Sequence, residues 1–198
     1  MPFSTATMGN MKTEAIYQYL ERIANLLRTD NRKSVAEKGL QPVQLEALHF
    51  LSHCNRYSNT PAAVADFLGL TKGTVSQTLG LLENLGMIEK QPDRKDRRVV
   101  HLQLTPKGMK VINETLPPNT LQTGLRSVSP AEQEHILSAL EIMLRAMQQA
   151  NQLRTFGVCK SCRHHRLEAD SQRRCELTGE ALQGDDAEKI CREHETPA

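Results

Sequence analysis

The hydrophobic pattern of the chain changes period in its middle. Apolar residues recur at helical intervals through two short segments between residues 60 and 86, with Gly69 separating them. Farther along, Val100, Leu102 and Leu104 alternate with polar residues, which is the pattern of a half-buried strand. The pattern therefore predicts a mainly α-helical protein that contains one small β-hairpin.

The ends of the two short helices are marked by particular residues. Thr60 and Thr71 each carry a hydroxyl that accepts a hydrogen bond from a free backbone N–H, so each is predicted to cap a helix. Gly69 and Gly86 are expected to end these helices, because glycine adopts the left-handed conformation without strain. Two helices joined by a tight turn fit the helix-turn-helix geometry that enters a DNA major groove. The outer face of the second helix is predicted to carry Lys72, Thr74, Gln77 and Thr78.

A basic loop is expected at the tip of the hairpin. We predict strands at Met87–Gln91 and Val99–Leu104, with the sequence PDRKDRR between them. His101 and Gln103 are expected to point outward from the second strand. The four cations of the loop repel one another unless solvent or a polyanion surrounds them, and DNA phosphates favour each cation by counterion release. A solvated turn of mixed charge is the alternative interpretation.

The strings LTKGTVSQTLGLLENLGMIEK, DRKDRR and LTPKG resemble the winged helix-turn-helix of the MarR family of bacterial transcriptional regulators. The resemblance extends over about residues 12–153. It implies a homodimer on a pseudo-palindromic operator in double-stranded DNA, with recognition helices in successive major grooves and Arg97 in the minor groove. The further DNA contacts of this interpretation are Arg94, Lys95 and Arg98 in the wing and Lys72, Thr74, Ser76, Gln77 and Thr78 in the helix.

Gln77 departs from the family pattern, because many relatives have arginine at this position. Glutamine pairs best with adenine, whereas arginine pairs best with guanine. We therefore expect an operator preference that differs from the usual one.

Two segments that flank this region each carry a single apolar stripe at helical spacing. Such stripes usually pack inside one subunit, but a helix-turn-helix unit of this size has few surfaces left for two more long helices. Two DNA half-sites also require a partner related by two-fold symmetry. A capping box at Ser129 and Glu132 precedes the second stripe. The predicted dimer interface consists of Ile16, Leu20, Ile23 and Leu27 with Ile136, Leu140, Met143 and Met147.

Cysteines accumulate after the family resemblance ends. Of the five cysteines, Cys159, Cys162, Cys175 and Cys191 lie in the last 40 residues. In a reducing cytosol such a set is more typical of metal binding than of disulfides. These four are predicted to bind zinc, with His194 as a reserve ligand, and so to staple a small module that has few apolar residues. An iron–sulfur cluster and metal-free thiols are the alternatives that spacing alone leaves open.

Charge and hydropathy place the chain among cytoplasmic proteins with a local basic surface. The net charge is only +2, but residues 71–110 hold eight lysines and arginines against four aspartates and glutamates. No apolar run reaches the ~18 residues that span a bilayer, so no membrane association is expected. The expected organisation is a flexible N-terminus at 1–10, dimerisation helices with the winged helix at 11–153, of which the DNA-binding lobe occupies about 42–108, and a cysteine-rich appendage at 154–198.

These features together predict a dimeric, sequence-specific transcriptional regulator that acts as a repressor. Its signal is expected to be a small molecule, bound between the dimer helices and the lobe, or the redox or metal state of the cysteines. A cytosolic adaptor or a thiol-redox protein acting through the tail is the alternative. Cys159 and Cys162 lack the βαβ surroundings of a thiol oxidoreductase, and the chain has no glycine-rich phosphate loop. We therefore expect no enzyme activity.

Overall fold

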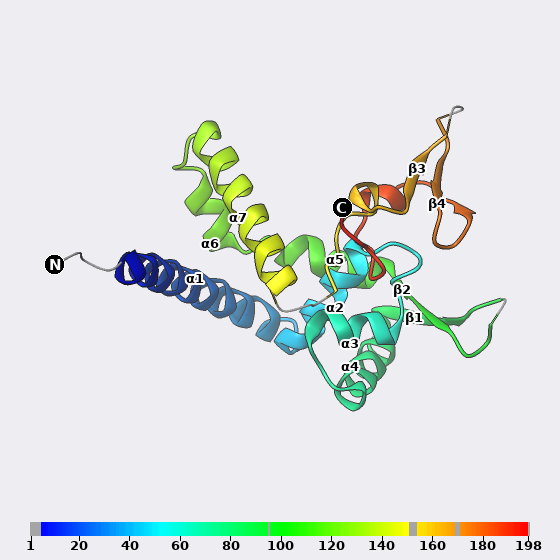
Figure 1. Ribbon diagram of the computed structural model, residues 1–198. Helices are drawn as coiled ribbons and strands as arrows, with labels where there is room; N and C mark the ends of the chain where they lie inside the picture. Colours follow the sequence, from blue (N-terminus) through cyan, green and yellow to red (C-terminus); the bar gives the residue numbers. More distant parts are fainter. Residues whose placement is uncertain (1–4, 95, 151–153, 169–170, 198) are drawn as a thin grey trace.

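The computed structural model describes residues 5–94, 96–150, 154–168 and 171–197, with side chains from residue 11 onward. Figure 1 shows a helical lobe with a two-stranded hairpin, helices that project from the lobe, and a small C-terminal module. Lys95, one of the predicted wing contacts, lies outside the described residues. In the described part of the chain, no helix has the length and apolar character needed to cross a membrane.

The helices of the lobe begin and end where their capping residues predict. They are α2 (Pro42–His53), α3 (Pro61–Leu68) and α4 (Lys72–Asn84). The hydroxyls of Thr60 and Thr71 each accept a hydrogen bond from the third residue of the helix that follows. Gly69 and Gly86 both have left-handed backbone angles, which confirms them as helix ends. The inward faces of the helices form the core with Leu45, Leu48, Phe50, Val75, Leu79 and Leu82.

The hairpin consists of β1 (Ile88–Pro92) and β2 (Val100–Leu104), paired antiparallel with Ile88 opposite Leu104. Each strand begins one residue later than predicted. The expected outward direction of His101 is wrong, because its ring is partly buried and hydrogen bonded to Asn59 in the loop before α3. Gln103 is exposed, as predicted. The hairpin is therefore fastened to the helices along one side.

The LTPKG string closes the base of the hairpin and begins α5 (Pro106–Thr115). The Thr105 hydroxyl caps α5 by accepting from the Gly108 N–H, and it donates to the carbonyl of Gly86 at 2.7 Å. A Cβ at position 108 would collide with the carbonyl oxygen of Met87. Glycine is required there because the backbone of α5 approaches the start of β1 this closely.

Two long helices and one short helix project from the lobe on one side (Figure 1). The long helices are α1 (Thr5–Ala36) and α7 (Pro130–Ala150), and the short one is α6 (Asn119–Leu125). Of the N-terminal segment 1–10, residues 5–10 form the first turns of α1, and residues 1–4 lie outside the described part. The predicted capping box is present, since Glu132 accepts from the Ser129 N–H at 2.9 Å. Asp30 of α1 accepts a hydrogen bond from the Thr120 N–H of α6.

The C-terminal module is a small sheet with two 3₁₀ turns. Its elements are η1 (Cys159–Ser161), β3 (His165–Leu167), β4 (Arg173–Cys175), β5 (Glu180–Ala181) and η2 (Asp186–Glu188), with sheet order β3-β4-β5. The module packs on the lobe. The ring of Phe156 lies 5.9 Å from that of Phe50 and 5.2 Å from that of Phe67. Ile190 forms backbone bridges with Cys54 on one side and Val158 on the other.

Candidate nucleic-acid interface

The outer face of α4 is free of the lobe's own packing. Lys72, Ser76 and Gln77 are exposed on it, as is Thr74, whose hydroxyl lies 3.0 Å from that of Thr71. The prediction that Thr78 belongs to this face is wrong. Its side chain is only 6% exposed, and its hydroxyl donates to the Thr74 carbonyl inside the helix. Thr78 therefore belongs to the packing face, one turn after Thr74.

Backbone hydrogen bonds hold the tip of the hairpin in a defined shape. The Asp93 N–H donates to the Val99 carbonyl at 2.9 Å, and the Asp96 N–H donates to the Asp93 carboxylate at 2.7 Å. Arg98 forms an ion pair with Asp96 at 2.8 Å, and its hydrogen bonds lower the pKa of that carboxyl group. Arg98 is thus partly engaged in shaping the tip.

Arg97 differs from its neighbour in the wing. In the described part of the chain its guanidinium forms no hydrogen bond or ion pair, and the side chain is exposed. Arg94 is likewise exposed at the tip. An arginine held on an ordered hairpin, with all of its donors free, is suited to insertion into a DNA groove.

The hairpin is anchored by residues for which the sequence analysis predicted no role. His101 lies between two acceptors, with Nδ1 2.6 Å from Asn59 Oδ1 and Nε2 3.1 Å from Asp93 Oδ2. The Asn59 carbonyl also accepts from the Leu102 N–H at 2.7 Å. His101 occupies a regular polar position in the alternation of the strand, so the hydrophobic pattern does not indicate this contact. The position of the wing thus depends on the loop that precedes α3.

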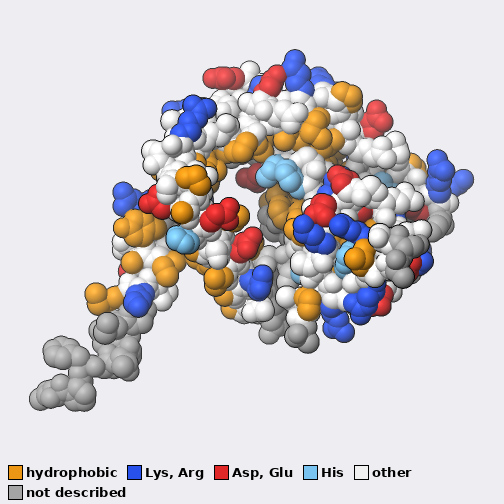
Figure 2. Space-filling model, turned by 90° about the horizontal axis from the view of Figure 1, so that it is seen from above, with side chains coloured by type: hydrophobic (Ala, Val, Ile, Leu, Met, Phe, Trp, Pro, Cys, Tyr) orange, Lys and Arg blue, Asp and Glu red, His pale blue; other side chains and the backbone are white. Residues whose placement is uncertain are grey.

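The predicted dimer residues form no core in a single chain. Ile23 is 50% exposed and Leu140 is 46% exposed. Leu20, Leu27 and Met143 are half-buried. Ile16, Ile136 and Met147 are also exposed. In Figure 2, hydrophobic side chains line the arm that ends in the grey N-terminal residues. The stripes on α1 and α7 are therefore apolar surfaces that one chain leaves uncovered.

The four predicted metal ligands come together, but the reserve ligand does not join them. Cys159, Cys162, Cys175 and Cys191 line one small cavity in the C-terminal module. Burial and the nearby thiols raise the pKa of Cys159 to about 12. His194 lies elsewhere, with Nδ1 2.6 Å from the Thr155 hydroxyl and Nε2 3.0 Å from the Ser161 hydroxyl. Both ring nitrogens of His194 are therefore occupied.

Cys54 is a buried packing residue at the end of α2. Its thiol donates to the Leu51 carbonyl, and burial raises its pKa to about 12. The same helix carries His49 and His53, whose rings meet edge to face with centroids 4.5 Å apart. Among the described residues no group of three potential ligands includes them. His49 and His53 are exposed residues on the surface of α2, whereas Cys54 belongs to the packing.

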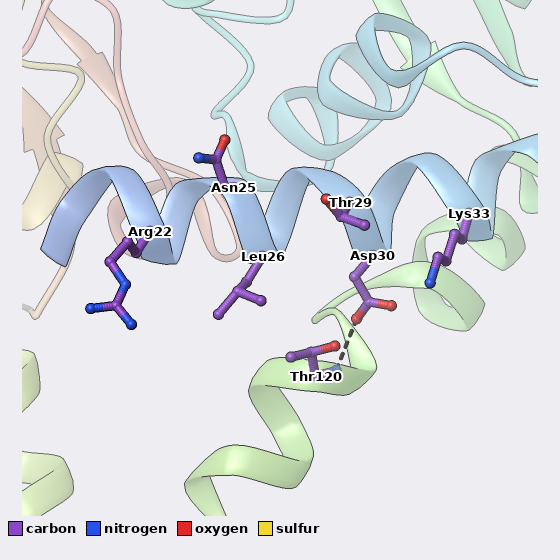
Figure 3. A pocket seen from close by; sticks show the side chains of 7 residues that line it. All are labelled: Arg22, Asn25, Leu26, Thr29, Asp30, Lys33 and Thr120. Carbon is purple, nitrogen blue, oxygen red and sulfur yellow. Dashed lines mark hydrogen bonds between the residues drawn. The ribbon is translucent and has the colours of Figure 1, made fainter. Parts of the chain in front are cut away.

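A cavity of about 470 Å³ lies between α1 and α6 (Figure 3). Figure 3 shows the side chains of Arg22, Asp30 and Lys33 around it, with Leu26 as its aliphatic contact. Three further polar residues complete the lining, namely Asn25, Thr29 and Thr120. Six of the seven lining residues are polar or charged, whereas sites for small aromatic ligands are mostly lined by apolar residues.

Two capped helices followed by a two-stranded hairpin with a basic tip define a winged helix-turn-helix protein. The sequence model of the MarR family matches residues 38–99, which run from the start of the lobe into the hairpin. Residues 38–99 belong to the MarR family of transcriptional regulators. The cysteine-rich C-terminal segment lies beyond the matched residues.

Known proteins match a longer part of the chain. The transcriptional repressor MprA of Escherichia coli K12 is 28% identical over 128 residues, which make up 64% of this chain and 73% of MprA. The regulator MhqR of Bacillus subtilis is 22% identical over 141 residues, covering 71% of this chain and 95% of MhqR.

Solved structures share the fold. The MepR–DNA complex of S. aureus has a TM-score of 0.54 and 25% identity, covering 66% of this chain and 97% of MepR. A MarR regulator from Methanosarcina mazei has a TM-score of 0.59 and 22% identity, covering 69% of this chain and 99% of that protein. Since each solved chain is almost fully covered, about a third of this chain has no counterpart in them.

Proposed function

We propose that the protein is a homodimeric repressor that binds an operator in double-stranded DNA through α4 and the wing. The observation that carries the proposal is the wing itself, where Arg97, which has no partner among the described residues, is presented on a hydrogen-bonded tip. The relatives agree with this proposal, since MprA is a transcriptional repressor and MepR has been solved with DNA.

Two kinds of contact follow from this arrangement. Lys72, Thr74, Ser76 and Gln77 lie on the outer face of α4, where they would meet base edges and phosphates of a major groove. Arg97 would enter the adjacent minor groove, while Arg94 and Lys95 would contact phosphates. Arg98 would contribute less, because Asp96 already binds its guanidinium.

The dimer is proposed to form through the uncovered stripes of α1 and α7. A helix with a continuous apolar face buries that face against another element, and in one chain these faces have no such cover. A two-fold axis through this region would present two copies of α4 to successive half-sites.

The signal is proposed to reach the DNA-binding lobe from the C-terminal module. The module packs directly on α2 and on the loop before α3, and it contains the four clustered cysteines. A small effector in the cavity between α1 and α6 is the other route. This route has weaker support, because Leu26 is the one aliphatic residue among the seven residues that line the cavity.

The DNA proposal is tested by Arg97→Ala, with Arg126→Ala as a control that removes the same charge at the end of α6. Duplexes enriched from a random pool by the wild-type protein serve as operator. Arg97→Ala should weaken binding by about 1–3 kcal/mol, because a minor-groove contact is lost. Arg126→Ala should bind normally. Equal affinities for wild type and Arg97→Ala would contradict the proposal.

The dimer is tested by Leu140→Glu, because a carboxylate without a partner in an apolar interface is strongly unfavourable. Sedimentation should show a monomer for this variant. Glu141→Gln, which places an uncharged side chain at the next position of α7, should remain a dimer. A Leu140→Glu dimer with normal operator binding would place the interface elsewhere.

A further inference from the structure

The C-terminal module brings four cysteines from separate elements around one cavity. Cys159 and Cys162 come from η1 and its C-cap, Cys175 ends β4, and Cys191 follows η2. All four line the same cavity of about 30 Å³, which we call the cysteine cavity. Each of the chain's cysteines is free, so no disulfide accounts for this convergence. Four thiols around one point are the ligand set of a structural zinc ion or an iron–sulfur cluster.

Buried polar atoms surround the cysteine cavity. Nε2 of His165 is buried without a hydrogen bond in the described part of the chain, whereas Nε2 of His164 lies 3.5 Å from a carboxylate oxygen of Glu195, and both histidines line the cavity. Asn55, which is 1% exposed, lies beside Cys191, and its Nδ2 has no hydrogen-bond partner in the described part of the chain. N–H groups beside a metal centre commonly donate hydrogen bonds to its sulfur atoms. The residues around the cavity therefore supply hydrogen-bond donors for the sulfur atoms of a metal centre.

The spacing of the thiols bears on the kind of centre. Among the described residues, no three Cys, His, Asp or Glu side chains are close enough to hold a single metal ion as they stand. Zinc, with Zn–S bonds of about 2.3 Å, would require thiols to rotate inward. An iron–sulfur cluster holds its four thiolates around a larger body. Both centres share four-thiolate ligation, and they differ in colour and in inorganic sulfide.

Backbone hydrogen bonds join the cysteine cavity to residues 54–60, which we call the connecting loop. The Ile190 N–H donates to the His53 carbonyl, and the Ile190 carbonyl accepts from the Asn55 N–H, both at 2.9 Å. One residue beyond Cys191, the Arg192 N–H donates to the Ser58 hydroxyl at 2.8 Å. The ligand Cys191 is thus held directly between two contacts with the connecting loop.

The connecting loop in turn holds the wing. Asn59 accepts from the Leu102 N–H of β2 and contacts the ring of His101, which reaches Asp93 at the tip. Ser58 is fully buried, and its hydroxyl donates to Asn55 in the same loop. A change at Cys191 therefore has a short, hydrogen-bonded route to the base of the wing.

We propose that Cys159, Cys162, Cys175 and Cys191 hold a four-thiolate metal centre, and that this centre fixes the connecting loop and thereby the wing. The proposal rests on the proposed function for its biological meaning, but its two physical claims, metal binding and loop ordering, are measured without DNA. Loss of the centre would free Cys191, loosen the contacts of Ile190 and Arg192 with the loop, and release the wing from its position.

The first experiment measures iron, zinc and inorganic sulfide in the full chain purified without oxygen, together with its absorption spectrum. We expect about one equivalent of zinc in a colourless protein, or iron and sulfide with visible absorption. Either result supports the proposal and identifies the centre. A protein that takes up neither metal, even after incubation with zinc or with iron and sulfide, would overturn it.

Matched cysteine variants test the ligand assignment. Cys175→Ser should lower metal affinity by about tenfold or more, because a thiolate ligand is lost. Cys54→Ala is the control, since Cys54 lies near Cys191 without lining the cysteine cavity. It should retain its metal. Circular dichroism checks that both variants keep the helical lobe. Full metal content in Cys175→Ser would remove this residue from the centre and overturn the four-ligand proposal.

Hydrogen exchange tests the ordering of the loop. The Leu102 N–H is protected by the Asn59 carbonyl, and the Asn55 N–H by the Ile190 carbonyl. Removing the metal should speed exchange at both amides, whereas amides inside α4 should be unchanged. A metal-binding protein whose Leu102 amide exchanges equally with and without metal would overturn the coupling, even if Arg97→Ala confirms DNA binding.

Discussion

The helical lobe and the C-terminal module differ in what holds them together. In the lobe, Leu45, Leu48 and Leu82 are almost completely buried, and each such side chain contributes roughly 1.5–3 kcal/mol. In the described part of the module, the buried apolar residues are Cys159, Cys191 and Ala187, all small. The lobe therefore has a hydrophobic core of its own, whereas the module has only a minor one.

The polar contacts of the module do not make up this difference. Glu188 pairs with Lys160 and Arg173, but all three side chains are more than 40% exposed. Exposed ion pairs of this kind contribute about 0–1 kcal/mol each. The comparison indicates that the module depends on its docking to the lobe, and the proposed centre would add to its stability.

The largest effect is expected from a cavity in the lobe. Leu48→Ala removes a side chain that is 0% exposed in the core, and should lower the free energy of unfolding by about 2–5 kcal/mol. Denaturant unfolding followed by circular dichroism measures this change. A loss below 1 kcal/mol would mean that the lobe is not stabilised by its core.

The smallest effect on the free energy of unfolding is expected when a leucine of the module is changed to alanine. Leu167 is 67% exposed on β3, so Leu167→Ala should change the free energy of unfolding by less than about 0.5 kcal/mol. Metal content should also stay constant in this variant. A loss comparable to that of Leu48→Ala would show that the module has a hydrophobic core and would remove the contrast between the two regions.

Local signals predicted the lobe well. The hydroxyl caps at Thr60 and Thr71 and the glycine at position 86 define helix ends through bonds between neighbouring residues, so they can be predicted from a short stretch of sequence. Thr78 was misassigned because its position on α4 lies at the edge of the packing face, where helical periodicity does not decide direction.

Contacts between distant segments could not be predicted in the same way. Phe156 stacks against Phe50 and Phe67, and Asn59 fastens the wing, but no spacing rule connects these residues along the chain. The cysteines were predicted from their spacing, whereas the engagement of His194 by Thr155 and Ser161 required the fold. The attachment of the module to the lobe could therefore be seen only in the structure.

The central claim is that the module controls how strongly the lobe binds DNA. The most direct measurement is operator affinity for the metal-loaded protein, the chelator-treated protein and the variant with all four module cysteines changed to serine. A coupling of the usual size should make the loaded protein bind about 5–150-fold differently from the other two, which should agree with each other. If the three titrations overlay, under reducing and oxidising conditions alike, the module does not control the lobe and the claim is contradicted.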